Sequence, residues 1–192
     1  MALVVVGASV LIGVFGPRLQ ERNPSQLTPL ADVADAARQI QFAMQFDAIH
    51  RPAGAHVPTR AQIADLIESS LKSAWRPPDL APLGFVAILA GPATLPGSDA
   101  SIAILYEREG DTIESSRFLA LFVTLDHGRY ASFDEFGRIE PLRTNRSIIE
   151  RDDPTDPDSS ATMVFSDGDL LFTARADDQS ALESLVDELG AP

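Results

Sequence analysis

The first sixteen residues, Met1 to Gly16, carry no charged side chain and are almost entirely apolar. The run MALVVVGASVLIGVFG ends abruptly at Pro17 and Arg18, where a polar segment begins. A stretch of this composition is stable only away from water, either in a bilayer or inside a folded core. It therefore restricts the fold and the location of the chain more than any other feature of the sequence.

Three interpretations of this run are open: a membrane anchor, a cleaved secretory signal and a buried element of a globular core. Sixteen helical residues rise about 24 Å, which is short of the roughly 30 Å hydrocarbon core of a bilayer. A secretory signal usually has basic residues before its apolar part and a small-x-small cleavage site, and neither is evident here. We favour a membrane anchor at residues 1–16 that has lost its first turn, because a polar, Pro-containing linker at residues 17–27 follows it.

The charges beside this run give a weak prediction of orientation. Arg18 and Arg22 follow it and nothing basic precedes it, so the positive-inside rule places the rest of the chain in the cytoplasm. Glu21 lies between the two arginines and offsets them. Orientation therefore stays open on charge alone.

The remaining residues, 28–192, have the composition of one soluble domain. The chain has 192 residues, of which 45% are hydrophobic, and its net charge of −13 lies entirely after Pro17. So negative a surface repels nucleic acid phosphates, and we expect no direct nucleic acid binding. The absence of cysteine excludes disulfides, thiol catalysis and cysteine-based zinc sites.

Two helices are predicted at the start of this domain. The first has one apolar face at spacings of three and four, with Thr28 as its cap and Pro29 in its first turn: Leu30, Val33, Ala37, Ile40 and Met44. The segment 50–58, HRPAGAHVP, ends it. The second begins with a capping box at Thr59 and Gln62, ends at Pro77 and Pro78, and has a second apolar face: Ile63, Leu66, Ile67, Leu71 and Trp75.

After Asp79 short apolar runs alternate with turn residues, which is typical of strands. The expected strands are 84–90, 101–107, 117–125, 162–165 and 170–174, with shorter candidates at 130–133, 139–142 and 145–150. Short dividers such as Pro96-Gly97, His127-Gly128 and Asp167-Gly168 favour antiparallel neighbours. A third helix is expected from Ser180, with a capping box to Glu183 and a C-terminal cap at Gly190. The predicted class is α+β: an N-terminal membrane helix, two helices, an antiparallel β-sheet and a C-terminal helix.

No residue pattern in the chain has the spacing of a metal site. His50 and His56 lie six residues apart in a loop, a spacing that common zinc motifs do not use. An acidic cluster resembles a calcium loop in charge only, since Pro154 and Pro157 interrupt it: Glu150, Asp152, Asp153, Asp156 and Asp158. We interpret it as a solvated loop, and we predict no metal and no cofactor.

No residue pattern has the spacing of a catalytic site either. Asp126-His127 is next to Gly128 in an expected hairpin turn, and Asp167-Gly168-Asp169 is a second expected turn. Glu107 and Glu109 share a strand face without any sign of a pocket. Trp75 is expected in the core. We therefore predict no catalytic residue and no enzymatic activity.

An ordered set of short motifs between Pro78 and Leu185 resembles the extracytoplasmic domain of membrane-bound anti-sigma factors and related bacterial transmembrane regulators. The motifs are Leu83-Gly84-Phe85, Leu95-Pro96-Gly97, Ile104-Leu105-Tyr106, Leu119-Ala120-Leu121-Phe122-Val123, the run from Val164 to Phe172, and Ala181-Leu182-Glu183-Ser184-Leu185. Such proteins connect a cytoplasmic sigma-binding domain, through one membrane helix, to a domain outside. They control transcription by releasing the sigma factor.

The resemblance implies a membrane-tethered, extracytoplasmic regulatory or binding module that acts through an unidentified protein partner. It places Arg18 outside the cytoplasm, against the charge rule, and we follow the resemblance. The cytoplasmic His-x-x-x-Cys-x-x-Cys motif of these proteins is absent, so no sigma-binding residue is carried over. The chain is then either the outer half of a longer protein or a free-standing relative. A structural or assembly role at the envelope and, less favoured, a small exported hydrolase are the alternatives.

Overall fold

A computed structural model of the chain describes residues 27–52, 54–108, 118–127, 129–133, 139–141, 148–152, 160–176 and 179–189. The elements in chain order are β1 (Thr28–Pro29), α1 (Leu30–Ile49), α2 (Arg60–Leu71), the short 3-10 helix η2 (Ala81–Leu83), β2 (Phe85–Ala93), β3 (Ser101–Arg108), β4 (Phe118–Leu125), β5 (Tyr130–Phe133), β6 (Ile139–Pro141), β7 (Ile148–Arg151), β8 (Ala161–Asp167), β9 (Leu170–Ala176) and α3 (Gln179–Leu189).

The main sheet has six strands in the order β2-β3-β4-β9-β8-β7, and every neighbouring pair is antiparallel. It consists of two three-stranded meanders that meet where β4 pairs with β9. The turn at Gly168, with φ of 58°, joins β8 to β9 as predicted. The α+β class, the antiparallel sheet and the order of the three α-helices are thus confirmed for the described residues.

A second, three-stranded sheet joins the start of α1 to the segment after β4, in the order β1-β5-β6. Here β1 pairs with β5 in parallel, and the Thr28 N–H donates to the Arg129 carbonyl at 2.7 Å. The predicted helix cap at Thr28 is therefore wrong, since Pro29 is the N-cap residue and no side-chain cap bond forms. The predicted hairpin at His127-Gly128 is also wrong, because β4 and β5 belong to different sheets.

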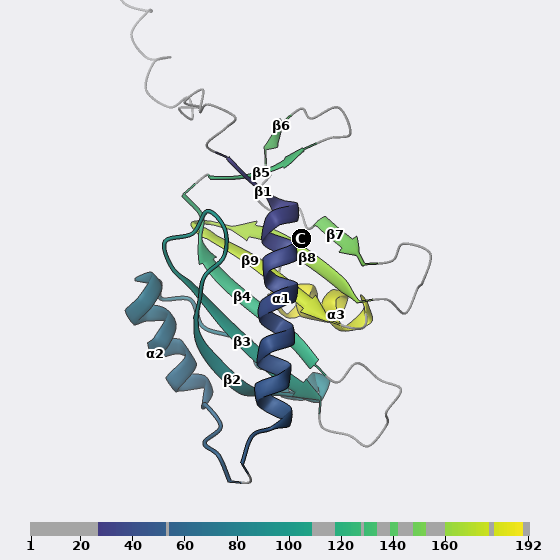
Figure 1. Cartoon of the computed structure of the whole chain (residues 1–192). Helices are drawn as coiled ribbons and strands as arrows, with labels where there is room; N and C mark the ends of the chain where they lie inside the picture. The colour runs from purple at the N-terminus through teal and green to yellow at the C-terminus, as the bar shows by residue number, and fades with distance from the viewer. Residues whose placement is uncertain are drawn as a thin grey trace, which may run out of the picture.

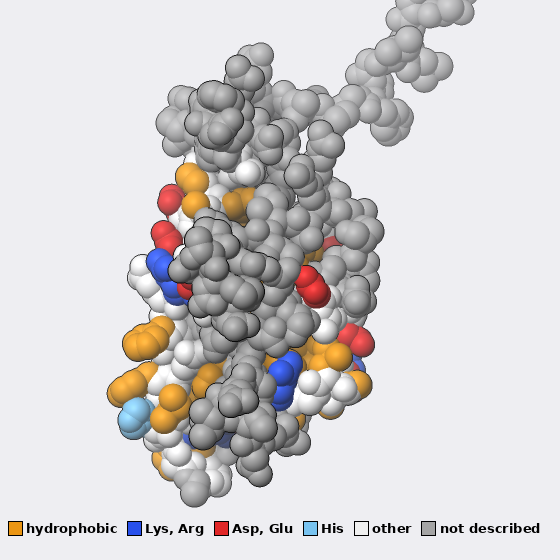
Figure 2. Space-filling view, turned by 90° about the vertical axis from the view of Figure 1, so that its right-hand side faces the viewer, with side chains coloured by type: hydrophobic (Ala, Val, Ile, Leu, Met, Phe, Trp, Pro, Cys, Tyr) orange, Lys and Arg blue, Asp and Glu red, His pale blue; other side chains and the backbone are white. Residues whose placement is uncertain are grey.

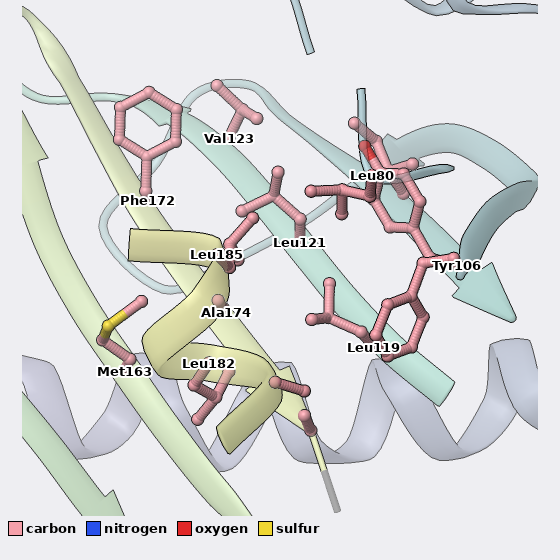
Figure 3. Packing of buried hydrophobic residues seen from close by; sticks show 14 of the residues in the cluster. Leu80, Tyr106, Leu119, Leu121, Val123, Met163, Phe172, Ala174, Leu182 and Leu185 are labelled. Atoms are coloured by element: carbon pink, nitrogen blue, oxygen red, sulfur yellow. The ribbon is translucent and has the colours of Figure 1, made fainter. Parts of the chain in front are cut away.

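Helices cover both faces of the main sheet: in Figure 1 α1 crosses the front, while α2, at the left, and α3, behind the sheet, pack into one core cluster on the opposite face. The hydrophobic cluster under α1 includes Leu30, Val33, Ala37, Leu105, Phe122 and Leu171. The cluster under α2 and α3 is larger and includes Ile63, Ile67, Leu121, Phe172, Leu182 and Leu185 (Figure 3). The layers are helix, sheet and helices, which explains why β3, β4, β8 and β9 are buried along nearly their whole length.

The ends of α2 test two local predictions. The capping box is confirmed: the Gln62 N–H donates to Thr59 Oγ1 at 3.3 Å, and the Thr59 N–H donates to Gln62 Oε1 at 2.8 Å. The predicted end at Pro77 is wrong, because Lys72 takes a left-handed conformation with φ of 55° and ends the helix there. Trp75 lies beyond the helix and packs on Phe172, with ring centroids 5.0 Å apart, so its placement at the core is confirmed.

The third predicted helix is present as α3, with Leu182 and Leu185 fully buried. It begins at Gln179, so Ser180 lies inside the helix rather than capping it. Gly190 and the expected anchor at residues 1–16 lie outside the described residues. Among the helices that the structure describes, none has the length and apolar composition needed to cross a bilayer.

Candidate functional site

The histidines at the α1–α2 connection make local contacts. His50 Nδ1 donates to the Phe46 carbonyl at 2.8 Å, and its ring lies on the Phe46 ring with centroids 4.1 Å apart. His56 Nε2 lies 3.2 Å from Gln62 Oε1. Within the described ranges, no group of three or more His, Cys, Asp or Glu side chains is arranged to hold a metal ion.

The connection itself is attached to the sheet. Arg51 Nη1 donates to the Ile88 carbonyl of β2 at 2.8 Å, and Arg51 Nη2 donates to the Ala55 carbonyl at 2.6 Å. The Pro- and Gly-containing loop between α1 and α2 is thus held against β2 at its first residues.

The Asp126-His127 pair lies at the end of β4. Ser166 Oγ donates to Asp126 Oδ2 at 3.3 Å, and the side chain of His127 is exposed. In a serine hydrolase the nucleophilic hydroxyl donates to an imidazole rather than to a carboxylate. Glu107 lies in β3, and Glu109 lies outside the described residues. This arrangement does not support assigning catalysis to any of these side chains.

One member of the acidic cluster has a specific partner that the sequence interpretation missed. Asp152 accepts from both terminal nitrogens of Arg175, with 2.9 Å between Nη1 and Oδ1. Arg175 is only 5% exposed, and its Nη1 also donates to Thr162 Oγ1 at 2.8 Å. These hydrogen bonds and the charge of Arg175 lower the pKa of Asp152 below its ordinary range, and burial opposes them.

The cavity beside this ion pair is small, about 140 Å³, and lies against the first half of α1. Its charged lining residues are Asp35, Arg38, Asp152 and Arg175. Each cation has a carboxylate partner, since Arg38 pairs with Asp35 at 2.7 Å. We therefore interpret the Arg175–Asp152 pair as a structural link between β9 and the end of the edge strand β7. Asp153, Asp156 and Asp158 lie outside the described residues, and Glu150 is in β7.

The feature best suited to function is an apolar stripe on the solvent side of α1. Phe42, Phe46 and Ile49 are 72%, 57% and 60% exposed. Their spacing of four and three places them on one face, and the face that packs on the sheet carries Val33 and Ala37 instead. We call this trio the outer α1 surface. Figure 2 shows hydrophobic side chains along the α1 edge of the molecule, beside a histidine.

The sequence contains a sign of this surface that the sequence interpretation missed. The predicted apolar face of this helix, from Leu30 to Met44, packs on the sheet. Phe42, Phe46 and Ile49 form a second apolar stripe at helical spacing, separate from this face. A helix of a domain this size needs only one apolar face to be stable, and exposed faces of large apolar side chains are common at sites of contact with other molecules.

Comparisons with known proteins give no match: no family model, no curated protein and no solved structure is similar to this chain.

Proposed function

We propose that this chain is a membrane-tethered, extracytoplasmic regulatory or binding module of the anti-sigma-factor type, which acts through protein contacts rather than catalysis. The observation that carries the proposal is the outer α1 surface. Three large apolar side chains on one helix face, each more than half exposed, form a suitable centre for a protein interface. The apolar run at residues 1–16 supplies the tether.

The negative net charge of the chain restricts the kind of partner that can bind the outer α1 surface. A net charge of −13 opposes approach to anionic lipid headgroups, so the outer α1 surface is better suited to a protein than to a lipid surface. A partner with an apolar centre and a basic rim complements both the stripe and the negative domain around it. The Asp35–Arg38 pair on the preceding turns of α1 supplies one polar boundary of the surface.

The tether is tested by fractionating cells that express the full chain and a variant without Met1 to Gly16. We expect the full chain to sediment with membranes and to be digested by protease added outside the cytoplasmic membrane. The truncated variant is expected in the soluble fraction. Recovery of the truncated variant only in inclusion bodies, or a full chain that never sediments with vesicles, contradicts the proposal.

The binding surface is tested with a photo-crosslinking residue at Phe46 and, as a control, at Lys72 on the opposite side of the sheet. We expect a discrete adduct from position 46 alone, which disappears when Phe42 and Ile49 are both replaced by Ser. Since both side chains are exposed, that double variant should retain its thermal midpoint. Equal adducts at both positions, or an adduct that survives the double variant, contradicts the proposal.

A structural or assembly role at the envelope is the second candidate, and the continuous apolar face on α1 favours it as well. In that case the adduct from position 46 joins two copies of this chain. Its mass then distinguishes the two candidates, because a regulatory module is expected to give an adduct with a different protein.

A further inference from the structure

A cavity of about 250 Å³ lies on the face of the sheet opposite α1, between the first turn of α2, the segment before η2, and β2 and β3. Its lining is mainly apolar and includes Pro58, Ile63, Pro77, Leu80 and Phe85. An apolar cavity of about 150 Å³ is large enough for benzene. This cavity therefore has room for a ring or a short aliphatic chain together with a small polar group.

Tyr106 provides a hydrogen-bond donor in the wall of this cavity. The side chain is 3% exposed, and its hydroxyl has no hydrogen-bond partner among the described residues. Figure 3 shows Tyr106 extending from β3 toward Leu80, and both residues line the cavity. A buried hydroxyl without a partner is unfavourable, so a ligand that brings an acceptor to it gains affinity.

Arg60 provides a cation at the same cavity. Its Nε donates to the Pro77 carbonyl at 2.7 Å, which fixes the side chain beside the opening. Its two Nη groups have no acceptor among the residues that the structure describes. Arg60 and Tyr106 interact electrostatically: burial raises the pKa of Tyr106, and the positive charge of Arg60 opposes that rise.

Two further groups determine the sign of charge that the cavity prefers. The N-terminus of α2 lies at the opening and adds partial positive charge. Asp79 is the acid in the lining, and its Oδ1 accepts from the Ala81 N–H at 3.1 Å. One arginine and a helix N-terminus therefore outweigh one carboxylate that is already bound to the backbone.

We propose that this cavity binds a small monocarboxylic acid with an aliphatic or aromatic body. The carboxylate accepts from the Arg60 Nη groups and from the Tyr106 hydroxyl, and the body lies against Ile63, Leu80 and Phe85. A guanidinium and a carboxylate match in geometry and charge. The site is separate from the outer α1 surface and does not depend on the proposed function.

The ligand class is tested by titrating phenylacetate, hexanoate and cyclohexanecarboxylate into the full chain, with binding followed by calorimetry or ligand-observed NMR. We expect at least one acid to saturate below about 10 mM and its neutral amide to bind about tenfold more weakly. Saturation by none of the three acids overturns the proposal. Equal binding of the acid and of 2-phenylethylamine, which has the opposite charge, overturns it too.

The site is tested with the two tyrosines of the chain. Tyr106→Phe removes only the hydroxyl and should weaken binding of the acid about tenfold. Tyr130→Phe, in the cluster under α1, is the matched control and should bind as the wild type does. Arg60→Gln should weaken the acid more than its amide. Unchanged affinity in Tyr106→Phe with an unchanged thermal midpoint overturns the proposed site.

Discussion

Arg175 on β9 and Asp152, just after β7, form an ion pair that spans the outer three strands of the sheet. Thr162 on β8, the strand between them, accepts from the same guanidinium at 2.8 Å. The two partners differ in burial, since the side chain of Arg175 is 6% exposed and that of Asp152 is 33% exposed. The pair therefore holds a buried cation with a carboxylate that still contacts water.

This difference in burial predicts unequal effects of removing each partner. Asp152→Ala leaves a buried guanidinium whose side-chain partner among the described residues is Thr162, and it should lower the free energy of unfolding by about 3 kcal/mol. Arg175→Met fills the buried space with an apolar side chain and leaves Asp152 free to be hydrated. The loss in the free energy of unfolding should therefore be less than half of that in Asp152→Ala. Urea unfolding of both variants measures the two losses. Equal losses, or a larger loss for Arg175→Met, would show that Asp152 does not stabilise the buried charge.

The same pair predicts how stability depends on pH. The pKa of Asp152 is lowered from 3.8 by the hydrogen bond from Arg175, so the unfolded chain binds the proton more tightly than the folded chain does. The contribution of the carboxylate is complete above about pH 5 and disappears as pH falls below 3.8, through the lowered folded value. The stability difference between wild type and Asp152→Asn should therefore be constant from pH 7 to about pH 5 and narrow toward pH 3. Urea unfolding at each pH gives this difference, and one that stays constant down to pH 3 contradicts the assignment.

Local signals in the sequence predicted much of this fold. The helical spacing of Val33 and Ala37 and the capping box at Thr59 depend on neighbouring residues, and both predictions are confirmed. The predicted end of α2 at Pro77 and Pro78 was wrong, because Lys72 takes a left-handed conformation and ends the helix before the two prolines. The segment beyond Lys72 carries Trp75, which packs on Phe172 of β9, a contact that local sequence does not encode.

Features that depend on distant residues were not predictable in the same way. The parallel pairing of Thr28 with Tyr130 joins segments a hundred residues apart and involves only two residues of β1. The cavity beside Tyr106 likewise combines α2, β2 and β3. A buried partner for Arg175 could be expected from the sequence, because Arg175 is a charged residue inside the apolar strand LLFTARA. Sequence alone did not identify that partner as Asp152.

The capping box of α2 predicts a measurable loss of stability on Thr59→Ala. The variant removes the acceptor of the Gln62 N–H, and we expect a loss of about 1 kcal/mol. Ser69→Ala in the same helix is the control: its hydroxyl donates to the Leu66 carbonyl from an exposed position, so its removal should be neutral or slightly stabilising. Thermal and urea unfolding give both values, and equal losses in the two variants would contradict a specific role for the cap.

The contact between Gly97 and Thr28 predicts that the turn before β3 is coupled to β1. Gly97 has φ of 74°, and a Cβ atom there would lie 2.3 Å from Thr28 Oγ1 and 2.9 Å from Thr28 Cβ. Gly97→Ala should therefore lower the free energy of unfolding by about 2 kcal/mol or more, from backbone strain and from the clash together. Gly54→Ala is the matched control, since its φ is 80° and nothing lies within 4 Å of the added atom, and it should cost about 1 kcal/mol.

A double variant separates the two contributions at Gly97. Thr28→Gly removes all three atoms nearest to the added Cβ, so Gly97→Ala should cost about as much in that background as Gly54→Ala costs in the wild type. Urea unfolding of the four proteins of this cycle gives the coupling energy between the two positions. A coupling energy near zero would mean that β1 moves aside without loss, and that its pairing with β5 contributes little to holding the start of α1 on the sheet.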